Sequence, residues 1–402
     1  MVINEYLETK VVNKCDVLVC GGGFAGISAA LASARQGKKT ILLEKEYILG
    51  GLGTAGIVTI YLPLCDGFGH QVSYGICEEL FRLSISMGAE ARYPENWLDS
   101  DDVSKRTAKD KRFEVQYNPS LFAMLVEQLL LDAGVEILYG TYAVSVSKDN
   151  DKIKAVIVEN KSGRRAIAVS SVVDATGDAD IVKFADAPFA VFGKGNVLAA
   201  WYYRYGKEGY KLQTLGFCDI SDEEKKAGKS VATLVDRRFS GLDGKEISEQ
   251  TILSHASTLS DIKKRRVADP TVIPTMIATI PQLRMTRRID GDYVLDESEA
   301  HKYFEDSVGM VSDWRKRGPV FEVPFRTLFS SKVKNLICAG RCTSVTDDMW
   351  DIMRVIPCCA VTGEAAGVAA AMTDDFSEIN VKALQEKLVK NGVKIHLNEI
   401  GL

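Results

Sequence analysis

The N-terminal part of the chain alternates between short apolar runs and glycine turns. The β-branched run at residues 17–20 stops directly at a glycine, which is typical of a buried central strand of a parallel sheet. Residues 27–35 are rich in Ala and Leu and predict a helix that ends at Gly37, and residues 40–43 predict a second strand. The chain therefore opens with a strand–helix–strand unit.

Similar patterns continue along the chain. Apolar positions at helical spacing predict helices, and short alternating runs predict strands. The expected helices are at residues 75–87, at 121–131 with Ser120 as the cap, and at 358–372 with Pro357 at the first position. The expected strands are at residues 135–138, 142–146, 153–159, 166–169, 171–174 and 335–339. The middle strands form a small antiparallel sheet inserted into the parallel one.

The character of the sequence changes between residues 187 and 320. Clustered tyrosines, charged helix faces and an arginine-rich stretch replace the pattern of strands and turns. We therefore expect an inserted domain that covers the site. The predicted division is 1–186 and 321–372 for the first domain, 187–320 for the insertion and 373–402 for a C-terminal helical tail, with a polar surface excursion at 89–111.

Composition and charge argue against several classes of protein. The 402 residues are 46% hydrophobic and carry a net charge of −4, and no basic tract for nucleic acid stands out. The longest apolar stretches, such as residues 365–372, are too short to span a bilayer. The N-terminal residues are charged where a signal peptide needs an apolar run. We expect a soluble cytoplasmic protein without a nucleic-acid or membrane partner, and a homo-oligomer is compatible with the sequence.

Cysteine and histidine spacing gives little support for a metal centre. The nine cysteines form no C-x-x-C motif, and the four histidines are not paired at ligand spacing. We expect most of the cysteines to be buried, reduced side chains. The sequence therefore predicts neither a disulfide scaffold nor a metal site.

The first glycine turn has the spacing of a dinucleotide-binding motif. Gly21, Gly23 and Gly26 fit G-x-G-x-x-G, in which glycines allow a tight turn, close approach of a pyrophosphate, and close packing of helix against strand. The helix N-terminus offers N–H groups and partial positive charge to phosphates. Glu44 follows the second strand, where a carboxylate can accept ribose hydroxyls. The alternative is a glycine turn that binds nothing, but the strand, helix, second strand and acid in register favour a dinucleotide.

Two further turns contain residues that could bind a ligand or take part in a reaction. Residues 50–56 are mostly Gly and Ala and predict a backbone that lies against a large flat ligand, with a flexible loop as the alternative. The strand at 171–174 ends in a turn that bears Asp178 and Asp180. These acids could form a metal or acid/base pair, but such residues more often cap a turn and the helix after it.

Together these motifs resemble those of FAD-dependent oxidoreductases. The segments that carry the resemblance are the opening glycine motif with Glu44, the Gly50-Gly51 doublet, the turn at 174–178, the arginine-rich 287–293, and the closing stretches at 335–341 and 354–370. The resemblance covers nearly the whole chain, and the closing stretches are similar to those of a bacterial family of mostly unassigned substrate. It implies FAD as the cofactor and an α/β fold of the type shared by glutathione reductase and fumarate reductase. That fold is a Rossmann-like three-layer FAD-binding domain with an inserted substrate or cap domain.

The same resemblance implies a set of contacts to FAD. Glu44 and its neighbour Lys45 would lie at the adenosine ribose. Ala143 or Val144 would contact adenine through the backbone. The helix that begins at Pro357 would point its N-terminus at the flavin N1/O2 edge, where reduced flavin carries negative charge that a helix dipole stabilises. The remaining implied contacts, along the pyrophosphate, flavin and ribityl chain, are Gly21, Gly23, Phe24, Ala25, Gly26, Gly50, Gly51, Gly53, Thr54, Ala175, Thr176, Gly177, Asp178, Gly340 and Arg341.

Two features depart from the pattern of glutathione reductase. No second G-x-G-x-x-G follows a strand, which argues against a dedicated NAD(P)H domain. No C-x-x-x-x-C follows the opening glycine motif, and the vicinal Cys358 and Cys359 begin a helix, where a disulfide would be strained. A redox-active cysteine pair is therefore disfavoured.

Flavin chemistry needs groups that orient a substrate near N5 and move a proton. The candidates for anchoring a carboxylate or polarised carbonyl are Arg354, Arg284 and Arg287. The candidate proton carriers are His70, Tyr61 and Asp348. A lone histidine is more often structural, and Arg287 could simply pair with neighbouring acids.

The sequence thus predicts a FAD-dependent oxidoreductase that transfers a hydride between flavin N5 and a small organic substrate. Oxygen, a diffusing reductant or a partner protein would exchange electrons with the flavin. The alternatives are a flavoprotein electron-transfer subunit, a redox-neutral flavoprotein, and a biosynthetic protein similar to thiazole synthase that holds an NAD-derived dinucleotide. The thiazole synthase family is shorter and lacks the long second domain.

Overall fold

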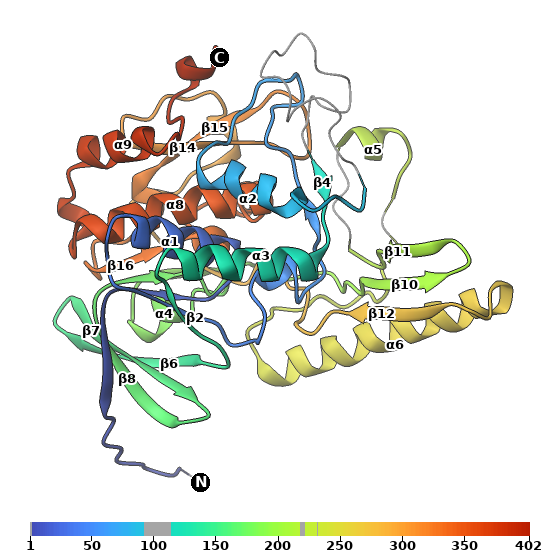
Figure 1. Ribbon diagram of the computed structural model, residues 1–402, viewed down its shortest axis with the longest axis horizontal. Helices are drawn as coiled ribbons and strands as arrows, with labels where there is room; N and C mark the ends of the chain where they lie inside the picture. The colour runs from blue at the N-terminus through green and yellow to red at the C-terminus, as the bar shows by residue number, and fades with distance from the viewer. Residues whose placement is uncertain (1, 92–113, 218–221, 231) are drawn as a thin grey trace.

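A computed structural model describes residues 2–91, 114–217, 222–230 and 232–402 of the chain (Figure 1). The expected surface excursion at 89–111 lies almost wholly outside the described residues. The strands of the main sheet are β1 (Val11–Cys20), β2 (Thr40–Leu43), β5 (Glu136–Leu138), β6 (Tyr142–Asp149), β7 (Lys152–Asn160), β8 (Gly163–Asp174) and β16 (Leu336–Cys338). The helices packed around it are α1 (Phe24–Arg35), α2 (Ile76–Ile85), α3 (Pro119–Asp132), α4 (Asp180–Phe184), α7 (Asp347–Met353), α8 (Ile356–Met372) and α9 (Val381–Lys390).

The parallel part of the main sheet brings four strand ends together. Its order is β5-β2-β1-β8-β7-β6, and β16 also pairs with β8. In register, Cys20 lies opposite both Leu43 and Asp174, and Cys338 also lies opposite Asp174. The loops that follow β1, β2, β8 and β16 therefore leave the sheet side by side, at the edge where α/β proteins bind their ligands.

Strand β8 joins the antiparallel strands to the parallel ones. The sequence pattern predicts two short segments, at 166–169 and 171–174, but β8 is one continuous strand. Its first half pairs with β7 in antiparallel register, and its last residues pair with β16 in parallel register. The predicted small antiparallel sheet is therefore an extension of the parallel sheet.

The two faces of β1 are buried in different cores, so the domain has three layers. Val17 and Val19 face a core shared with α1 and α8. Leu18 and Cys20 face a second core that contains apolar residues of β7 and α4. This alternation is the two-residue period of a strand buried on both faces. The predicted α/β fold with a parallel central sheet and small antiparallel sheets is confirmed.

Helix α8 runs through the middle of the molecule and packs directly on α1. A Cβ added at Gly363 would lie 2.3 Å from the carbonyl oxygen of Ala25, and one at Gly367 would lie 2.2 Å from that of Ala29. Only glycine therefore allows these two helix backbones to approach so closely. Within the described residues, no single helix has the length and apolar content to cross a bilayer. Helices α7 and α8 have that length and apolar content only when taken together, and they are bent by 89° relative to each other.

Two helix starts differ slightly from the sequence-based expectation. Helix α3 is capped by Asn118, whose side chain accepts a hydrogen bond from the N–H of Leu121, and not by Ser120. Pro119 takes the first helical position because it needs no N–H partner there, which moves the cap to the residue before it. Helix α8 begins at Ile356, one residue before Pro357.

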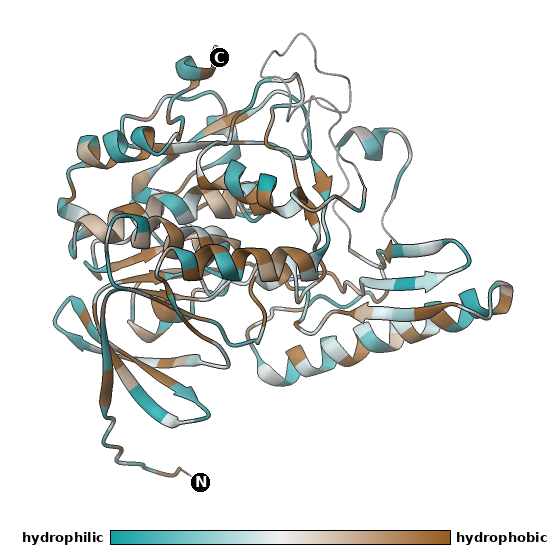
Figure 2. Ribbon diagram, in the orientation of Figure 1, coloured by the Kyte–Doolittle hydropathy of each residue, from teal (hydrophilic) through white to brown (hydrophobic). Residues whose placement is uncertain are grey.

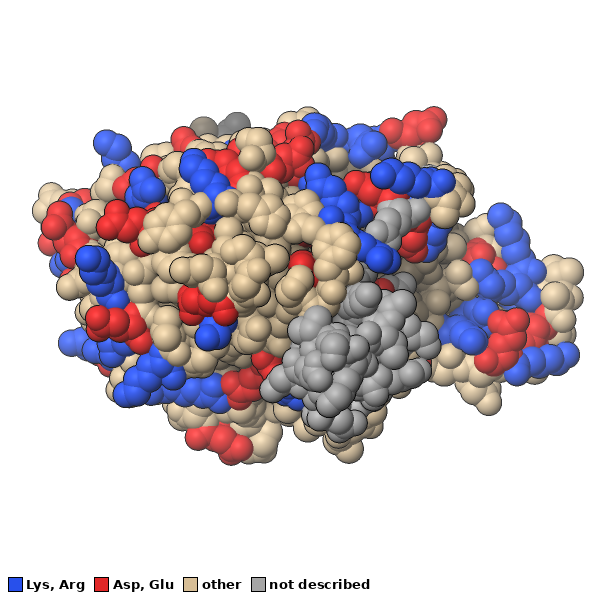
Figure 3. All heavy atoms as spheres, turned by 90° about the horizontal axis from the view of Figure 1, so that it is seen from above, with Lys and Arg blue, Asp and Glu red and all other residues tan. Residues whose placement is uncertain are grey.

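An arm built from the middle of the chain projects from this body (Figure 1). It contains the sheet of β10 (Tyr202–Gly206), β11 (Gly209–Gln213) and β12 (Ile273–Ile277), and the long α6 (Gly244–Ala268). The Tyr202 hydroxyl ties the sheet to α6 through Asp261 at 2.6 Å. Figure 2 shows apolar residues along the central strands and a mixture of polar and apolar residues along α6. Figure 3 shows basic and acidic side chains interspersed over one face of the molecule, including the arm.

Several short strands and one short helix lie outside the main sheet and the arm. The remaining elements are β3 (Ile60–Tyr61), β4 (Val115–Gln116), β9 (Phe189–Val191), α5 (Asp222–Lys226), β13 (Arg287–Ile289), β14 (Ser307–Ser312) and β15 (Val320–Pro324). Strand β14 lies within the predicted insertion yet contacts α8. The proposed boundaries at 187 and 320 stay a prediction.

Candidate functional site

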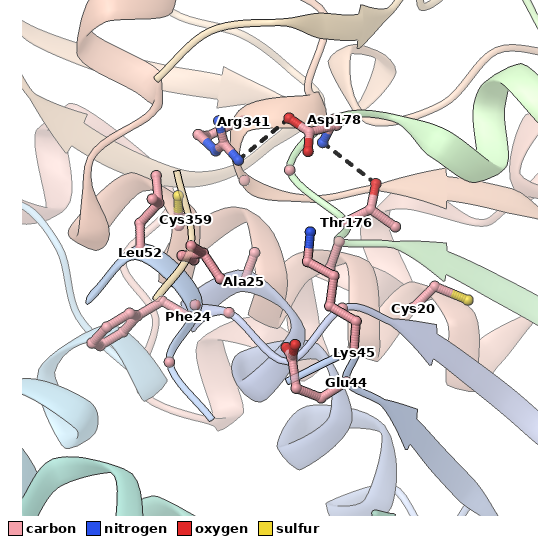
Figure 4. Close-up of a pocket in the computed structure, with 18 of the residues that line it drawn as sticks. Cys20, Phe24, Ala25, Glu44, Lys45, Leu52, Thr176, Asp178, Arg341 and Cys359 are labelled. Atoms are coloured by element: carbon pink, nitrogen blue, oxygen red, sulfur yellow. Dashed lines mark hydrogen bonds and ion pairs between the residues drawn. The ribbon is translucent and has the colours of Figure 1, made fainter. Parts of the chain in front are cut away.

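A cleft lies at the edge where β1, β2, β8 and β16 end (Figure 4). It contains about 1240 Å³ of empty volume, including space open to solvent. The residues predicted for FAD that line it are Gly21, Gly23, Phe24, Ala25, Glu44, Lys45, Gly50, Gly51, Gly53, Ala143, Ala175, Thr176, Gly177, Asp178, Gly340 and Arg341. The structure therefore gathers most of the predicted cofactor residues around one cavity.

The three glycines of the opening motif have different local reasons to be glycine. Gly21 has a φ of +104°, and a Cβ there would lie 2.4 Å from the carbonyl oxygen of Ala175. A Cβ on Gly26 would lie 1.8 Å from the carbonyl oxygen of Gly21, so Gly26 serves helix packing and does not line the cleft. At Gly23, no described atom lies within 4 Å of the position that a Cβ would take. A side chain at Gly23 would enter the space where a pyrophosphate needs to approach the backbone.

The carboxylate of Glu44 is fixed by two backbone N–H groups. Its Oε2 accepts from Gly22 at 2.8 Å and its Oε1 accepts from Glu46 at 2.8 Å. Burial raises the pKa of Glu44, and these two hydrogen bonds act in the opposite direction. Each oxygen keeps a further lone pair, so the carboxylate can still accept a ribose hydroxyl.

The glycine-rich loop lies beside the opening turn. The N–H of Gly50 donates to the carbonyl oxygen of Gly22 at 2.8 Å, and Gly50 and Gly51 both have positive φ. A Cβ on Gly51 would lie 3.2 Å from the Cα of Gly23. Thr54 is turned away from the cleft, with its hydroxyl on the carbonyl oxygen of Leu49. The loop therefore exposes backbone without side chains to the cavity, and the hydrogen bond of Thr54 stabilises the loop on the side that faces away from the cavity.

The carboxylates of the acidic turn after β8 have two different roles: one caps the turn, and two lie at the cleft. Asp174 is fully buried and accepts hydrogen bonds from the Thr176 hydroxyl and the N–H of Val182, so it caps the turn and α4. Asp178 accepts from the Thr286 hydroxyl at 2.7 Å, and the Arg341 guanidinium lies 3.6 Å away. Asp180 lines the cleft, and burial together with the nearby Asp178 and Asp174 raises its pKa to about 6. The cap expected from Asp178 and Asp180 is therefore provided by Asp174, whereas Asp178 and Asp180 contact Thr286 and Arg287.

Among the described residues, no group of three or more His, Cys, Asp or Glu side chains is placed to hold a metal ion. The predicted cofactor residues Val144, Thr54, Gly26 and Pro357 are not among those that line the cleft. Ile356 and Cys359 line it from the first turn of α8, three positions apart. They could have been found from helical spacing once the direction of α8 was known.

Arg354 lies two residues before the first residue of α8 and also lines the cleft. Its guanidinium donates to Asp351 from Nη2 at 2.6 Å and from Nε at 3.0 Å. It also lies over the rings of Phe217 and Trp314, at 5.4 and 5.7 Å from their centroids. These contacts fix a permanent positive charge at the start of α8, in addition to the partial positive charge of the helix N-terminus.

The vicinal cysteines are both free thiols. Cys358 is buried, whereas Cys359 lines the cleft, where Figure 4 shows its side chain. Burial raises the pKa of Cys359 to about 11, although Arg341 and Arg354 act to lower it. The thiol is therefore protonated at neutral pH.

Of the six catalytic candidates, Arg354 alone is among the cleft-lining residues that the structure describes. His70 is bound to Asp66 through Nδ1 at 2.8 Å. Tyr61 is fully buried with its hydroxyl on the carbonyl oxygen of Cys77, and burial holds its pKa well above the ordinary value. Asp348 is exposed and pairs with Lys194.

Neither of the two remaining arginines is among the residues that line the cleft, although Arg287 contacts one that does. Arg287 donates to the carbonyl oxygen of Ala179 and lies near Asp180 at 3.5 Å. Arg284 is buried, and its guanidinium lies over the rings of Trp201 and Phe217. From their positions in the sequence, these two arginines are expected to anchor the substrate. In the structure, their side chains instead pack between segments of the protein.

The donor set of the cleft fits FAD. It offers bare glycine backbone at Gly23 and Gly51, a fixed carboxylate at Glu44, and helix N-termini without side-chain caps on α1 and α8. A strand–glycine turn–helix unit followed by an acid at the end of the next strand defines a dinucleotide-binding fold. The structure therefore belongs to the class of Rossmann-type dinucleotide-binding proteins.

Comparison with known proteins identifies the family. Residues 16–198 and 199–388 match the family described as FAD dependent oxidoreductase. The chain belongs to this family, whose cofactor is FAD. The predicted family, cofactor and enzyme class are thereby confirmed.

Several curated relatives match part of the chain. The L-aspartate oxidase of Mycobacterium tuberculosis is 26% identical over 212 residues, which cover 46% of this chain and 40% of that protein. The digeranylgeranylglycerophospholipid reductase of Picrophilus torridus is 25% identical over 222 residues, which cover half of each chain. The thiamine thiazole synthase of Methanococcus vannielii is 30% identical over 176 residues, 42% of this chain and 58% of that one. The chain thus matches about 40 to 58% of the length of these relatives.

Among solved structures, the chain is similar to a geranylgeranyl bacteriochlorophyll reductase-like protein of Thermoplasma acidophilum. The sequence identity is 15% and the TM-score 0.43, over 95% of this chain and 84% of that one. A flavin-dependent brominase, Bmp2, gives a TM-score of 0.45 at 12% identity, over 94% and 84% of the two chains.

Proposed function

We propose that the protein transfers a hydride between FAD and a small organic acid whose anionic group pairs with Arg354. The observation that carries this proposal is the position of Arg354 in the cleft beside the N-terminus of α8. The wall provided by Ile280, Pro281 and Leu283 is apolar and suits the carbon skeleton of such a substrate. FAD supplies the hydride donor or acceptor at N5 of its ring.

The residues around Arg354 support an anchoring role. Asp351 accepts from Nε and Nη2 and holds the plane of the guanidinium, as an orienting carboxylate does. The guanidinium carbon also lies over the rings of Phe217 and Trp314, and these contacts limit its movement. A guanidinium held in this way binds a carboxylate with little loss of side-chain entropy.

The start of α8 supports charge stabilisation at the same place. The N-cap residue Val355 has no side chain that can satisfy the first N–H groups of the helix. These N–H groups and the helix dipole favour negative charge near Ile356 and Cys359, which line the cleft. Arg354 and α8 together would favour an anionic substrate and a reduced, anionic cofactor.

The test uses the FAD-loaded protein under anaerobic conditions. A panel of short carboxylic and amino acids is mixed with oxidised protein, and reduction is followed by bleaching near 450 nm. The reverse reaction uses photoreduced protein and unsaturated acids. With an active acid in hand, Arg354→Gln is expected to lower kcat/KM about 100-fold, as for loss of one partner of a buried charge pair.

The matched control is Arg326→Gln. Arg326 pairs with Asp306 at 2.9 Å, is half exposed, and does not line the cleft. This variant should retain wild-type kinetics, and both variants should retain FAD. Equal kinetics in Arg354→Gln and wild type would remove Arg354 from the mechanism. Reduction by protein donors only, with no response to any acid, would favour an electron-transfer subunit.

A further inference from the structure

The segment 279–286, here called the strap, connects the arm to the body of the protein. It runs from the end of β12 to the start of β13 and has no regular secondary structure. Ile280, Pro281 and Leu283 of the strap line the cleft. Backbone groups outside helices and sheets need other hydrogen-bond partners, so the position of the strap depends on what holds those groups.

The start of the strap is tied to the glycine-rich loop on which the cofactor site is built. The N–H of Thr279 donates to the carbonyl oxygen of Ala55 at 2.9 Å. The amide of Gln282 donates to the carbonyl oxygen of Gly56 and accepts from the N–H of Trp201. Two neighbouring residues of the loop therefore hold the strap at this end.

The middle of the strap is held by the side chain of Asn196. Its Oδ1 accepts from the N–H of Arg284 at 2.9 Å and from the N–H of Met285 at 3.0 Å. Its Nδ2 donates to the carbonyl oxygen of Met285 at 2.6 Å. Asn196 is 4% exposed, so these three hydrogen bonds form where water does not compete.

Arg341 holds the strap from the body of the protein. Its Nη1 donates to the carbonyl oxygens of Leu283 at 2.9 Å and Arg284 at 3.0 Å. Its Nη2 lies 3.6 Å from Asp178, which in turn accepts from the hydroxyl of Thr286. Figure 4 shows the Arg341 guanidinium pointing toward Asp178 and away from Phe24.

The turn after β8 leaves room for this guanidinium. Gly177 has a φ of +80°, and a Cβ there would lie 2.3 Å from Nη2 of Arg341. The hydrogen bonds from a charged donor to two carbonyl oxygens are stronger than neutral ones. The turn and Arg341 therefore form one connection between β8, β16 and the strap.

From these contacts we propose that Arg341 and Asn196 are positioning residues that hold the strap as a wall of the FAD cleft. Their loss lets the strap move away from the body, opens the cleft to water and shortens the time that FAD stays bound. This role goes beyond the proposed reaction, because it concerns retention of the cofactor and needs no substrate.

The experiment measures release of FAD from the loaded protein after dilution, followed by the rise of flavin fluorescence. Arg341→Gln and Asn196→Ala are each expected to release FAD at least tenfold faster than wild type. Arg341→Lys keeps a charged donor that can reach one carbonyl oxygen, so it should restore part of the slow release. The control Arg326→Gln should release FAD within twofold of wild type.

A second readout separates positioning from general destabilisation. Hydrogen–deuterium exchange of the loaded variants should increase in peptides covering 279–286 and stay unchanged in peptides covering α1. Arg341→Lys is the mildest of these changes, so it serves if the larger ones prevent folding, and it should still release FAD faster than wild type. Wild-type release rates in these variants, or exchange that rises equally throughout the protein, would overturn the proposal. Neither result depends on whether an acid is turned over, so the proposed reaction can fail while this proposal stands.

Discussion

At the scale of single residues, glycine is required in this cleft for two separate reasons. Gly21 and Gly26 are glycine because neighbouring backbone leaves no room for a Cβ. Gly23 has room for one, so its identity is explained only by a ligand that needs the space. This difference separates a structural requirement from a binding requirement within one motif.

Replacing Gly23 by alanine tests the binding requirement. The backbone at Gly23 is extended, with φ −71° and ψ 179°, which alanine adopts without strain. We expect the Kd for FAD to rise at least tenfold while the melting temperature of the apoprotein stays near that of wild type. Gly193→Ala is the control, because Gly193 also has open space around the Cβ position and does not line the cleft. Equal FAD affinity in both variants would mean that Gly23 does not face the cofactor.

Glu364 gives a second residue-scale prediction. It is buried in α8, its Oε2 accepts from the N–H of Ile76 at 2.7 Å, and burial raises its pKa to about 8. The pKa of Glu364 in the folded state exceeds the unfolded value of about 4.5. Its contribution to the stability of the fold is therefore fully present below about pH 4.5 and is lost as the pH rises through 8.

The corresponding variant is Glu364→Gln, which cannot ionise. The stability of the wild type relative to this variant should fall between about pH 5 and 9, by on the order of a few kcal/mol. Urea unfolding of both apoproteins across this range measures the difference. Parallel pH curves would show that Glu364 does not carry a raised pKa.

At the scale of elements, the contact of α1 with α8 sets the geometry of the cleft. Gly363 and Gly367 bring the α8 backbone against the carbonyl oxygens of Ala25 and Ala29. The glycine turn leads into α1, and Arg354 lies beside the N-terminus of α8. The distance between these two helices therefore fixes the distance between the two ends of the site. The packing of two helices therefore controls the spacing of functional groups that are distant in sequence.

Gly367→Ala tests this packing without touching the cleft. The added methyl group meets backbone at 2.2 Å, so we expect a loss of about 1–3 kcal/mol in unfolding free energy, measured with urea. Gly244→Ala, at the start of α6 where the Cβ position is open, should stay within about 1 kcal/mol of wild type. Equal stability of the two variants would contradict the close approach of α1 and α8.

At the scale of the whole molecule, the cleft is assembled from segments of both ends and the middle of the chain. Its lining comes from the loops after β1, β2, β8 and β16, from the strap, and from the start of α8. A ligand that contacts all of these segments binds the folded chain and has no equivalent site on the unfolded chain. FAD should therefore act as a stabilising link across the whole fold.

This coupling predicts a melting temperature that depends on FAD concentration. At a FAD concentration of about 100 times Kd, the folded state gains about 2.7 kcal/mol, which corresponds to several degrees. Differential scanning fluorimetry with an extrinsic dye, on apoprotein titrated with FAD, measures the shift. AMP at the same concentrations is the control and should give a smaller shift, because it cannot reach the flavin end of the cleft. A melting temperature independent of FAD would contradict a single shared site.

The sequence by itself determined the opening strand–helix–strand unit and its dinucleotide-binding motif. These features follow from local rules, because the glycine spacing, the two-residue strand period and the acid after the second strand are all set within a short stretch. FAD itself, and most of the residues found around the cleft, came from the resemblance to FAD-dependent oxidoreductases. Only the tertiary structure decided that β8 is one strand shared by both kinds of pairing, and that 279–286 forms a wall of the cleft. It also decided that Arg354 faces the cavity while His70, with its imidazole on Asp66, does not line it. The reason is physical. The strap takes its backbone partners from residues more than 200 positions away, such as Ala55 and Gly56, and the side of an element that faces the cavity depends on how the elements pack, which no local pattern encodes.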